Sequence, residues 1–146
     1  MYRHILTATD GSDWAGKGLD AAIDLAALMK AELTILTASD PYPDYLVADG
    51  YMVAGDVDRI RGAAESNAQE ILRAAVAKAK SKGVEAKSLY INAGPAALAI
   101  TEEAEALGCD LIVIGSRGRR GLTKLFLGSQ AAEVLAGTQL PVLIVK

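Results

Sequence analysis

One glycine-rich segment in the last third of the chain has the residue types and the spacing of an anion-binding site. Gly115 and Gly118 are followed, after nine further residues, by Gly128 and Ser129. Glycine lacks a Cβ atom, so the backbone at such positions can turn sharply or approach a ligand closely. Gly128 and Ser129 precede a helical pattern, and the N–H groups at the start of a helix have no partner within it. The pattern predicts that backbone N–H groups of this segment bind an anion. The alternative is that these are turn and helix-cap residues without a ligand.

Four cations and no acidic residue lie between Gly115 and Gly128, although the formal net charge of the chain is −3. Arg117 is the strongest candidate ligand among them, because a planar guanidinium group can donate two parallel hydrogen bonds to a pair of phosphate oxygens. Arg119, Arg120 and Lys124 are weaker candidates, since charged residues of this kind are equally often a solvated surface.

Strand patterns and helix patterns alternate along the whole chain. The expected strands, which are short and apolar, cover residues 3–9, 33–38, 86–91, 111–114 and 141–145. The expected helices, which repeat apolar residues every three or four positions, cover residues 15–26, 57–82, 97–107 and 130–135. Such alternation is typical of a doubly wound α/β fold, in which helices cover a parallel sheet. In these folds a ligand binds beyond the carboxyl ends of the strands, where the strand order reverses.

Three motifs together resemble the universal stress protein family. The spacing G-x2-G-x9-G-S after a strand resembles the nucleotide-binding signature of its ATP-binding members. The opening RHILTATDGS resembles the first strand and turn of the family, and the ending LPVLIVK resembles its last strand. The resemblance covers the whole chain and implies a single universal stress protein domain over residues 1–146, in the ATP-binding branch. It also implies an open five-stranded parallel sheet of order 3-2-1-4-5 with helices on both faces, of the adenine nucleotide alpha hydrolase-like kind.

The same resemblance implies where a nucleotide binds. With this strand order the reversal falls between the first and fourth strands, so Asp10 and Gly115 lie on either side of one crevice. The phosphates are expected on backbone N–H groups of the glycine segment and of the following helix, with Gly115 nearest the ribose and the Ala38 backbone at the adenine edge. The implied nucleotide-binding residues are Ala8, Thr9, Asp10, Ala38, Ile114, Gly115, Arg117, Gly118, Gly128, Ser129 and Gln130.

Asp10 has two interpretations. A carboxylate beside phosphates is repulsive, so a binding role requires that Asp10 faces the nucleoside or a metal ion. The resemblance favours the nucleoside, where Asp10 accepts a hydrogen bond from the ribose or from adenine. The alternative is that Asp10 and Ser12 together cap the N-terminus of the first helix.

The composition argues against several classes of protein. An acidic chain lacks the basic face that nucleic-acid binding requires, and no apolar run reaches the ~18 to 20 residues of a membrane span. Cys109 is the only cysteine, so no disulfide forms within the chain, and we expect it to be a small buried hydrophobic residue. The single cysteine and the lack of a recognisable leader peptide favour a reducing cytoplasm.

The remaining candidate residues are weaker. His4 lies within the first expected strand, and we expect a structural role because no nucleophile can be placed near it. Residues 39–56 form a long loop for a compact domain, and such loops are often functional. Its tyrosines Tyr42, Tyr45 and Tyr51 either cover the nucleotide, form a partner surface or are scattered surface residues. The P-loop and dinucleotide motifs are absent, as are clusters of metal-ligating residues.

Three functions remain open at this point. The leading one is an ATP-binding regulatory module in the stress response, which signals to an unidentified protein partner, with Mg²⁺ or Mn²⁺ held mainly by the phosphates. The second is an enzyme that hydrolyses ATP slowly. Apart from Asp10, however, no residue near the glycine segment is an obvious base, so no catalytic residue is assigned. The third is a nucleotide-free dimerisation partner.

A homodimer is expected through Pro141 to Val145. These residues form an apolar strand, expected at the edge of the sheet, and an unprotected edge invites pairing with its copy. The family resembled dimerises there.

Overall fold

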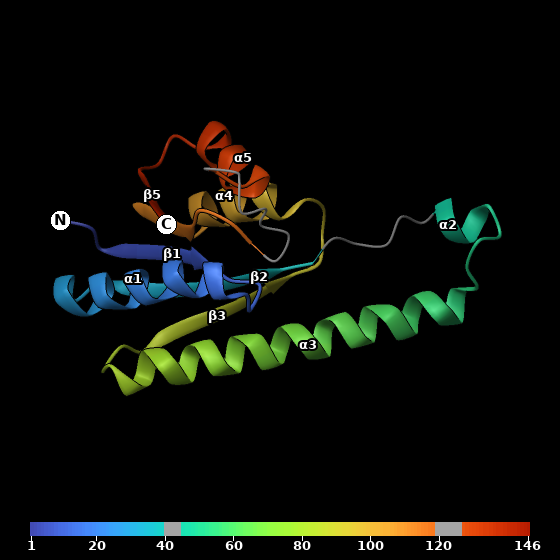
Figure 1. Cartoon of the computed structure of the whole chain (residues 1–146), viewed down its shortest axis with the longest axis horizontal. Helices are drawn as coiled ribbons and strands as arrows, with labels where there is room; N and C mark the ends of the chain where they lie inside the picture. Colours follow the sequence, from blue (N-terminus) through green and yellow to red (C-terminus); the bar gives the residue numbers. More distant parts are fainter. Residues whose placement is uncertain (40–44, 119–126) are drawn as a thin grey trace.

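The computed structural model describes residues 1–39, 45–118 and 127–146, which form a sheet with helices on both faces (Figure 1). The described strands are β1 (His4–Ala8), β2 (Glu32–Ala38), β3 (Ala86–Ile91), β4 (Leu111–Gly115) and β5 (Val142–Val145). The described helices are α1 (Asp13–Met29), α2 (Tyr45–Ala48), α3 (Ala54–Ser81), α4 (Ala96–Ala106) and α5 (Ser129–Gly137). None of these described helices is both long enough and apolar enough to cross a membrane.

The five strands are all parallel, and their order is β3-β2-β1-β4-β5. The expected fold class and strand order are therefore confirmed. At the centre, β1 pairs with β4 so that Ile5 lies opposite Leu111 and Thr7 lies opposite Val113. Every residue of β4 is buried. A strand covered on both faces needs apolar residues at successive positions, which explains its continuous apolar sequence.

Two separate apolar layers hold the helices to the sheet. Successive side chains of a strand point to opposite faces. Ile5 therefore packs in the layer with α1 and α3, whereas Leu6 packs in the layer with α4 and α5. Figure 1 shows these two helix pairs on opposite sides of the sheet. Ala, Val, Leu and Ile make up most of both layers, as expected for a chain with only 5% aromatic residues.

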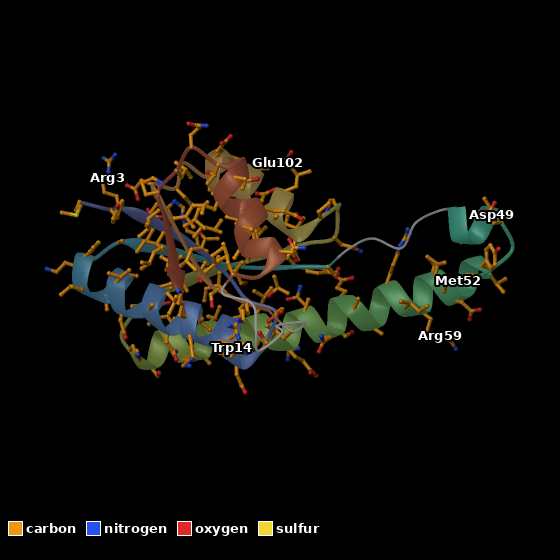
Figure 2. The ribbon with its side chains drawn as sticks, turned by 45° about the horizontal axis from the view of Figure 1, so that its top comes forward. Arg3, Trp14, Asp49, Met52, Arg59 and Glu102 are labelled. Atoms are coloured by element: carbon orange, nitrogen blue, oxygen red, sulfur yellow. The ribbon has the colours of Figure 1, made fainter. Side chains whose placement is uncertain are left out.

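The expected loop at 39–56 contains the short helix α2, and α3 begins within it at Ala54. Together α2 and the first turns of α3 extend beyond the end of the sheet, where Figure 2 labels Asp49 and Met52 (Figures 1 and 2). Tyr51 lies there and is 78% exposed. Tyr42 and the side chain of Tyr45 lie outside the described residues.

The apolar stripe of α3 is more fully buried in the second half of the helix than in the first. Ala68 and Ala75 are buried in the second half of the helix, while Ile60 in the first half is partly exposed. Helical periodicity reveals an apolar face, but tertiary packing decides how much of that face is covered.

Asp110 ties β1 to β4 at their amino ends. Its carboxylate accepts hydrogen bonds from the backbone N–H groups of Arg3 and His4, with distances from 2.9 to 3.0 Å. Burial raises the pKa of this carboxyl, but the His4 and Arg3 donors and the Arg3 charge outweigh burial, so the pKa lies below its ordinary value. A carboxyl of this kind stabilises the fold above its unfolded pKa, and the contribution is lost as the pH falls through the folded pKa.

Replacing Asp110 with alanine is expected to lower the free energy of unfolding by about 1 to 3 kcal/mol at pH 7, because two backbone donors lose a charged acceptor. The difference from the parent should shrink below about pH 4, where the unfolded carboxyl protonates. Urea denaturation at pH 7 and pH 3 measures both effects, with Glu85→Ala at an exposed position as the control. Equal stability of Asp110→Ala and the parent at pH 7 would contradict this prediction.

Candidate functional site

The carboxyl ends of β1 and β4 meet where the strand order reverses. From this central pair the chain continues in opposite directions across the sheet, from β1 to β2 and from β4 to β5. Asp10 follows β1 and Gly118 follows β4, and a Cβ atom on Gly118 would lie only 2.8 Å from Asp10 Oδ2. Two segments that are far apart in the sequence therefore converge at the predicted crevice.

Asp10 shapes the turn that leads into α1. Its Oδ1 accepts a hydrogen bond of 2.9 Å from the N–H of Ser12, and Thr9 Oγ1 accepts one of 3.2 Å from the N–H of Gly11. The N-cap of α1 is Ser12, whose hydroxyl accepts a hydrogen bond of 3.2 Å from the N–H of Ala15. The capping interpretation therefore applies to Ser12 and not to Asp10, whose Oδ2 lies against the glycine segment.

The two ends of the glycine segment lie against each other. The Gly128 N–H donates a hydrogen bond of 2.7 Å to the carbonyl of Ser116. A Cβ atom on Gly128 would lie 3.1 Å from that carbonyl oxygen and 3.3 Å from Arg117 Cα. The backbone of Gly128, with φ −69° and ψ 156°, is in a region open to every residue. Glycine is favoured here by the close approach of two backbones and not by its conformational freedom.

The start of α5 presents backbone donors beside this contact. Gly128 is the N-cap, and its carbonyl accepts the bond from the Ala132 N–H that begins the helix. The N–H groups of Ser129 and Gln130 precede that bond, so they have no acceptor within the helix, and both residues are exposed. The Gln130 side chain accepts a hydrogen bond of 2.9 Å from the N–H of Ala97. This bond ties the start of α5 to the start of α4.

The end of β2 leaves the backbone of Ala38 beside β1. The Thr9 N–H donates to the carbonyl of Leu36 at 2.9 Å, while the Ser39 N–H donates to Ile91 of β3 at 3.0 Å. Backbone groups of a strand alternate between its two neighbours. The N–H and carbonyl of Ala38 therefore point toward the β1 side, beyond the last pairing described there, where they offer one donor and one acceptor.

The end of β1 places its last residues on different faces of the sheet. Ala8, like Ala38, packs on the layer with α4 and α5. Thr9 lines a hollow of about 370 Å³ between α1 and α3, together with Ser12 and Ile71. Its contribution to the crevice stays a prediction.

Gly115 lies in direct contact with α1. A Cβ atom on Gly115 would overlap the carbonyl group of Trp14, and one on Gly18 would overlap the Gly115 nitrogen and lie 2.7 Å from the carbonyl carbon of Ile114. The Ile114 side chain is buried in the layer with α4 and α5. Close packing of α1 on β4 is thus a sufficient reason for glycine at position 115, and its nearness to a ribose stays a prediction.

Sequence patterns did not suggest a role for Trp14, which lies in the first turn of α1 (Figure 2). Arg117 Cζ lies 4.7 Å from the centroid of its ring, and Lys17 Nζ lies 4.4 Å from it. Arg117 Nε is buried and has no hydrogen-bond partner within the described ranges. The signal available in the sequence was that Trp14 is the only tryptophan and follows the Asp10 turn closely. The other three cations of the segment, Arg119, Arg120 and Lys124, lie outside the described residues.

His4 and Cys109 show no sign of a chemical role. His4 Nε2 lies 2.9 Å from the hydroxyl oxygen of Thr34 on the neighbouring strand. Burial, with a smaller effect from the Asp110 carboxylate, raises the pKa of the Cys109 thiol to about 11. The thiol is therefore neutral at physiological pH and a poor nucleophile.

Comparison with known proteins identifies the family. The model of the universal stress protein family matches residues 1–146. The chain belongs to this family. The universal stress protein YxiE of Bacillus subtilis (strain 168) is 39% identical over 149 residues, which cover 100% of both chains.

Two solved structures resemble this universal stress protein over nearly their whole length. The hypothetical protein MJ0577 has a TM-score of 0.84 and 25% identity, and the match covers 100% of this chain and 96% of that one. A universal stress protein solved in complex with cAMP has a TM-score of 0.70 and 26% identity, with 99% and 96% covered.

The described part of this universal stress protein contains no group of three or more His, Cys, Asp and Glu side chains placed to hold a metal ion.

Proposed function

We propose that this universal stress protein, as a single domain over residues 1–146, is a regulatory module of the stress response that binds ATP. The convergence of Asp10, Gly118 and the Gly128 N-cap at the switch point supports this most strongly. Only small residues allow these backbones to approach so closely. The N–H groups of Ser129 and Gln130 are then left to bind an anion at the positive end of α5.

Each part of the nucleotide has a counterpart in this crevice. The phosphates bind the backbone N–H groups of the glycine segment and the start of α5, and the Ser129 hydroxyl adds a donor. Asp10 accepts a hydrogen bond from the ribose or adenine, on the side away from the phosphates. The Ala38 backbone meets the adenine edge. The complex of a relative with cAMP is consistent with an adenine nucleotide as the ligand.

A divalent ion, Mg²⁺ or Mn²⁺, accompanies ATP in this proposal and is held mainly by the phosphates. The chain fits such an arrangement, because the described residues offer no cage of carboxylates and Mg²⁺ often binds through phosphates and water. The ion would neutralise part of the phosphate charge and so lower the repulsion from Asp10.

The first alternative is an enzyme that hydrolyses the bound ATP slowly. Hydrolysis needs a base that positions a water molecule. Asp10 is a poor base because its Oδ1 already accepts a hydrogen bond from the Ser12 N–H. Phosphate release in the presence of Mg²⁺, at a rate that depends on Asp10, would favour the enzyme.

The second alternative is a dimerisation partner that binds no nucleotide. The contacts of Gly118 and Gly128 would then serve only to pack the loop. Mass spectrometry of gently purified protein separates this alternative from the other two, because a nucleotide carried through purification excludes it.

The protein is expected to bind ATP at least about tenfold more tightly than GTP. Adenine presents an amino donor beside a ring nitrogen acceptor, which match the carbonyl and N–H of Ala38, whereas guanine presents an acceptor beside a donor. Calorimetry with ATP, GTP and ITP measures the preference. ITP should bind as weakly as GTP because it shares the same edge without the 2-amino group. Equal affinities for ATP and GTP would refute the adenine placement.

The protein is also expected to form a homodimer through β5. This strand pairs with β4 on one side and forms the edge of the sheet on the other, and its Leu143 is 40% exposed. Light scattering at micromolar concentration with ATP should give a dimer for the parent and a monomer for Leu143→Arg. Leu107 is 42% exposed on another part of the surface, so Leu107→Arg is the control and should remain a dimer. A monomeric parent would count against this interface.

We place this module in the cytoplasm, where it signals to a protein partner that is not yet identified. The single buried cysteine is compatible with a reducing compartment. Conformation or dimer contacts that respond to the nucleotide would carry the signal. Capture of partners with and without ATP is the direct test.

A further inference from the structure

Two cations converge on one tryptophan at the edge of the candidate site. Lys17 comes from the second turn of α1 and Arg117 from the loop after β4, and both charged groups lie close to the half-buried ring of Trp14. Because both charged groups lie close to the same ring centroid, the two charges are less than about 10 Å apart. This is below the Debye length at about 0.1 M salt, so salt does not fully screen their mutual repulsion.

This pair of cations has no anionic partner within the described ranges. Neither Lys17 nor Arg117 lies within ion-pair distance of a described carboxylate. The Arg117 Nε is buried and has no hydrogen-bond partner there. An orphan donor of this kind is uncommon in folded proteins and calls for an explanation. Attraction to the indole ring offsets part of the repulsion, and an anion beside the two cations would offset the rest.

The cation pair lies at the phosphate end of the proposed site. Arg117 Cα lies against Gly128, the N-cap of α5, where the phosphates are proposed to bind. The Trp14 backbone contacts Gly115, which is expected nearest the ribose. Trp14 is therefore next to the glycine segment. The adenine edge proposed at Ala38 belongs to β2, on the other side of β1 from this segment.

We propose that Trp14 is a positioning residue for nucleotide binding, whose ring holds the Arg117 guanidinium and the Lys17 ammonium so that the two cations favour ligands with more phosphate groups. This inference rests on the proposed function, because it takes the ligand to be an adenine nucleotide. The ring restricts a long side chain that would otherwise lose freedom on binding. Two cations held at one ring attract each added phosphate charge, so the affinity order is ATP, then ADP, then AMP.

Calorimetry with AMP, ADP and ATP on a set of variants tests the positioning role. Trp14→Leu is expected to weaken ATP binding about threefold to tenfold and AMP binding less than about twofold, since the cation–π contacts that hold Lys17 and Arg117 are lost while both charges remain. Trp14→Phe, which keeps an aromatic ring, should recover most of the loss. Lys17→Ala should lower the ratio of ATP to AMP affinity and weaken its dependence on salt. Lys80→Ala, at an exposed position near the far end of α3, is the control and should leave the ratio unchanged.

The fluorescence of the parent protein gives a second readout that needs no variant. Trp14 is the only tryptophan, so every change in indole emission reports on this position. Saturating ATP is expected to change the emission, whereas saturating adenosine, which has no phosphate, is expected to leave it nearly unchanged.

Two results would overturn the inference. One is an unchanged ratio of ATP to AMP affinity in Trp14→Leu, which includes an equal loss of affinity for both nucleotides, and the other is equal emission changes with ATP and adenosine. Either of them in a protein that still binds ATP leaves the proposed function standing. Absence of binding by AMP, ADP and ATP to the parent would overturn both proposals together.

Discussion

The Gly128→Val variant is expected to remain folded and to bind ATP at least about a hundredfold more weakly than the parent. The added side chain would stand between the glycine segment and the first N–H groups of α5, where the phosphates are proposed to bind. Loss of two charge-assisted bonds, each worth about 1.5 to 3 kcal/mol, accounts for a change of this size. The measurement is calorimetric titration with ATP, with circular dichroism to check the fold.

The cost of this substitution to the fold is expected to be small by comparison. The backbone of Gly128 is extended, so valine meets no conformational strain there. Its Cβ would lie 3.1 Å from the Ser116 carbonyl oxygen, which must give by a few tenths of an ångström. We expect a loss of about 1 kcal/mol, at the low end for an added side chain in a packed region.

Gly137 at the other end of α5 provides the matched control. A Cβ atom there would touch only Thr101 Cγ2, at 3.7 Å, which is an ordinary contact. Gly137→Ala should therefore bind ATP as the parent does. If Gly128→Val is folded and binds ATP as tightly as this control, the phosphate site is misplaced and the proposed function fails.

The second large effect is expected on stability, from Gly18→Ala in the middle of α1. A Cβ atom at this position would overlap the Gly115 nitrogen and the carbonyl carbon of Ile114, which belong to the backbone of a buried strand. No side-chain rotation can relieve this overlap, so α1 must move away from β4. Overpacking of this kind costs about 3 kcal/mol, which corresponds to a fall in Tm of roughly 6 to 12 °C for a chain of this size.

Gly16→Ala in the same helix is an internal control, for which the opposite change in stability is expected. No atom lies within 4 Å of a Cβ built at Gly16. Gly16→Ala should therefore raise the stability by about 0.5 to 1 kcal/mol, because alanine loses less backbone entropy in a helix. Differential scanning calorimetry of the two variants measures both effects. A Gly18→Ala variant as stable as Gly16→Ala would show that α1 does not pack on β4 as described.

Local patterns in the sequence were sufficient for the type and order of most elements. Helices and strands differ in the period of their apolar residues, and that period is a property of neighbours along the chain. The continuous apolar run at 111–114 identified the buried strand β4, and Gly128 with Ser129 identified the start of α5. The strand order came from the family resemblance and not from periodicity, because no local pattern states which strands lie side by side.

The cap of α1 and the end of the long loop were less well predicted. Asp10 and Ser12 both suit a helix N-terminus by type, and only the path of the turn decided that Ser12 caps the helix while Asp10 faces the glycine segment. Residues 45–48 form a helix within the expected loop, since one short turn carries too few residues to show a period.

Only the tertiary structure decided which segments distant along the chain contact each other. The sequence by itself determined that glycines stand at 18, 115 and 118, but it did not reveal what each one approaches. Gly18 proved to contact Gly115, and Gly118 proved to contact Asp10. Trp14 likewise carries no motif, and its place beside Arg117 follows from the packing of α1 on β4. Such contacts depend on how one element lies across another, and that geometry is set by the whole core and not by the residues next to each position.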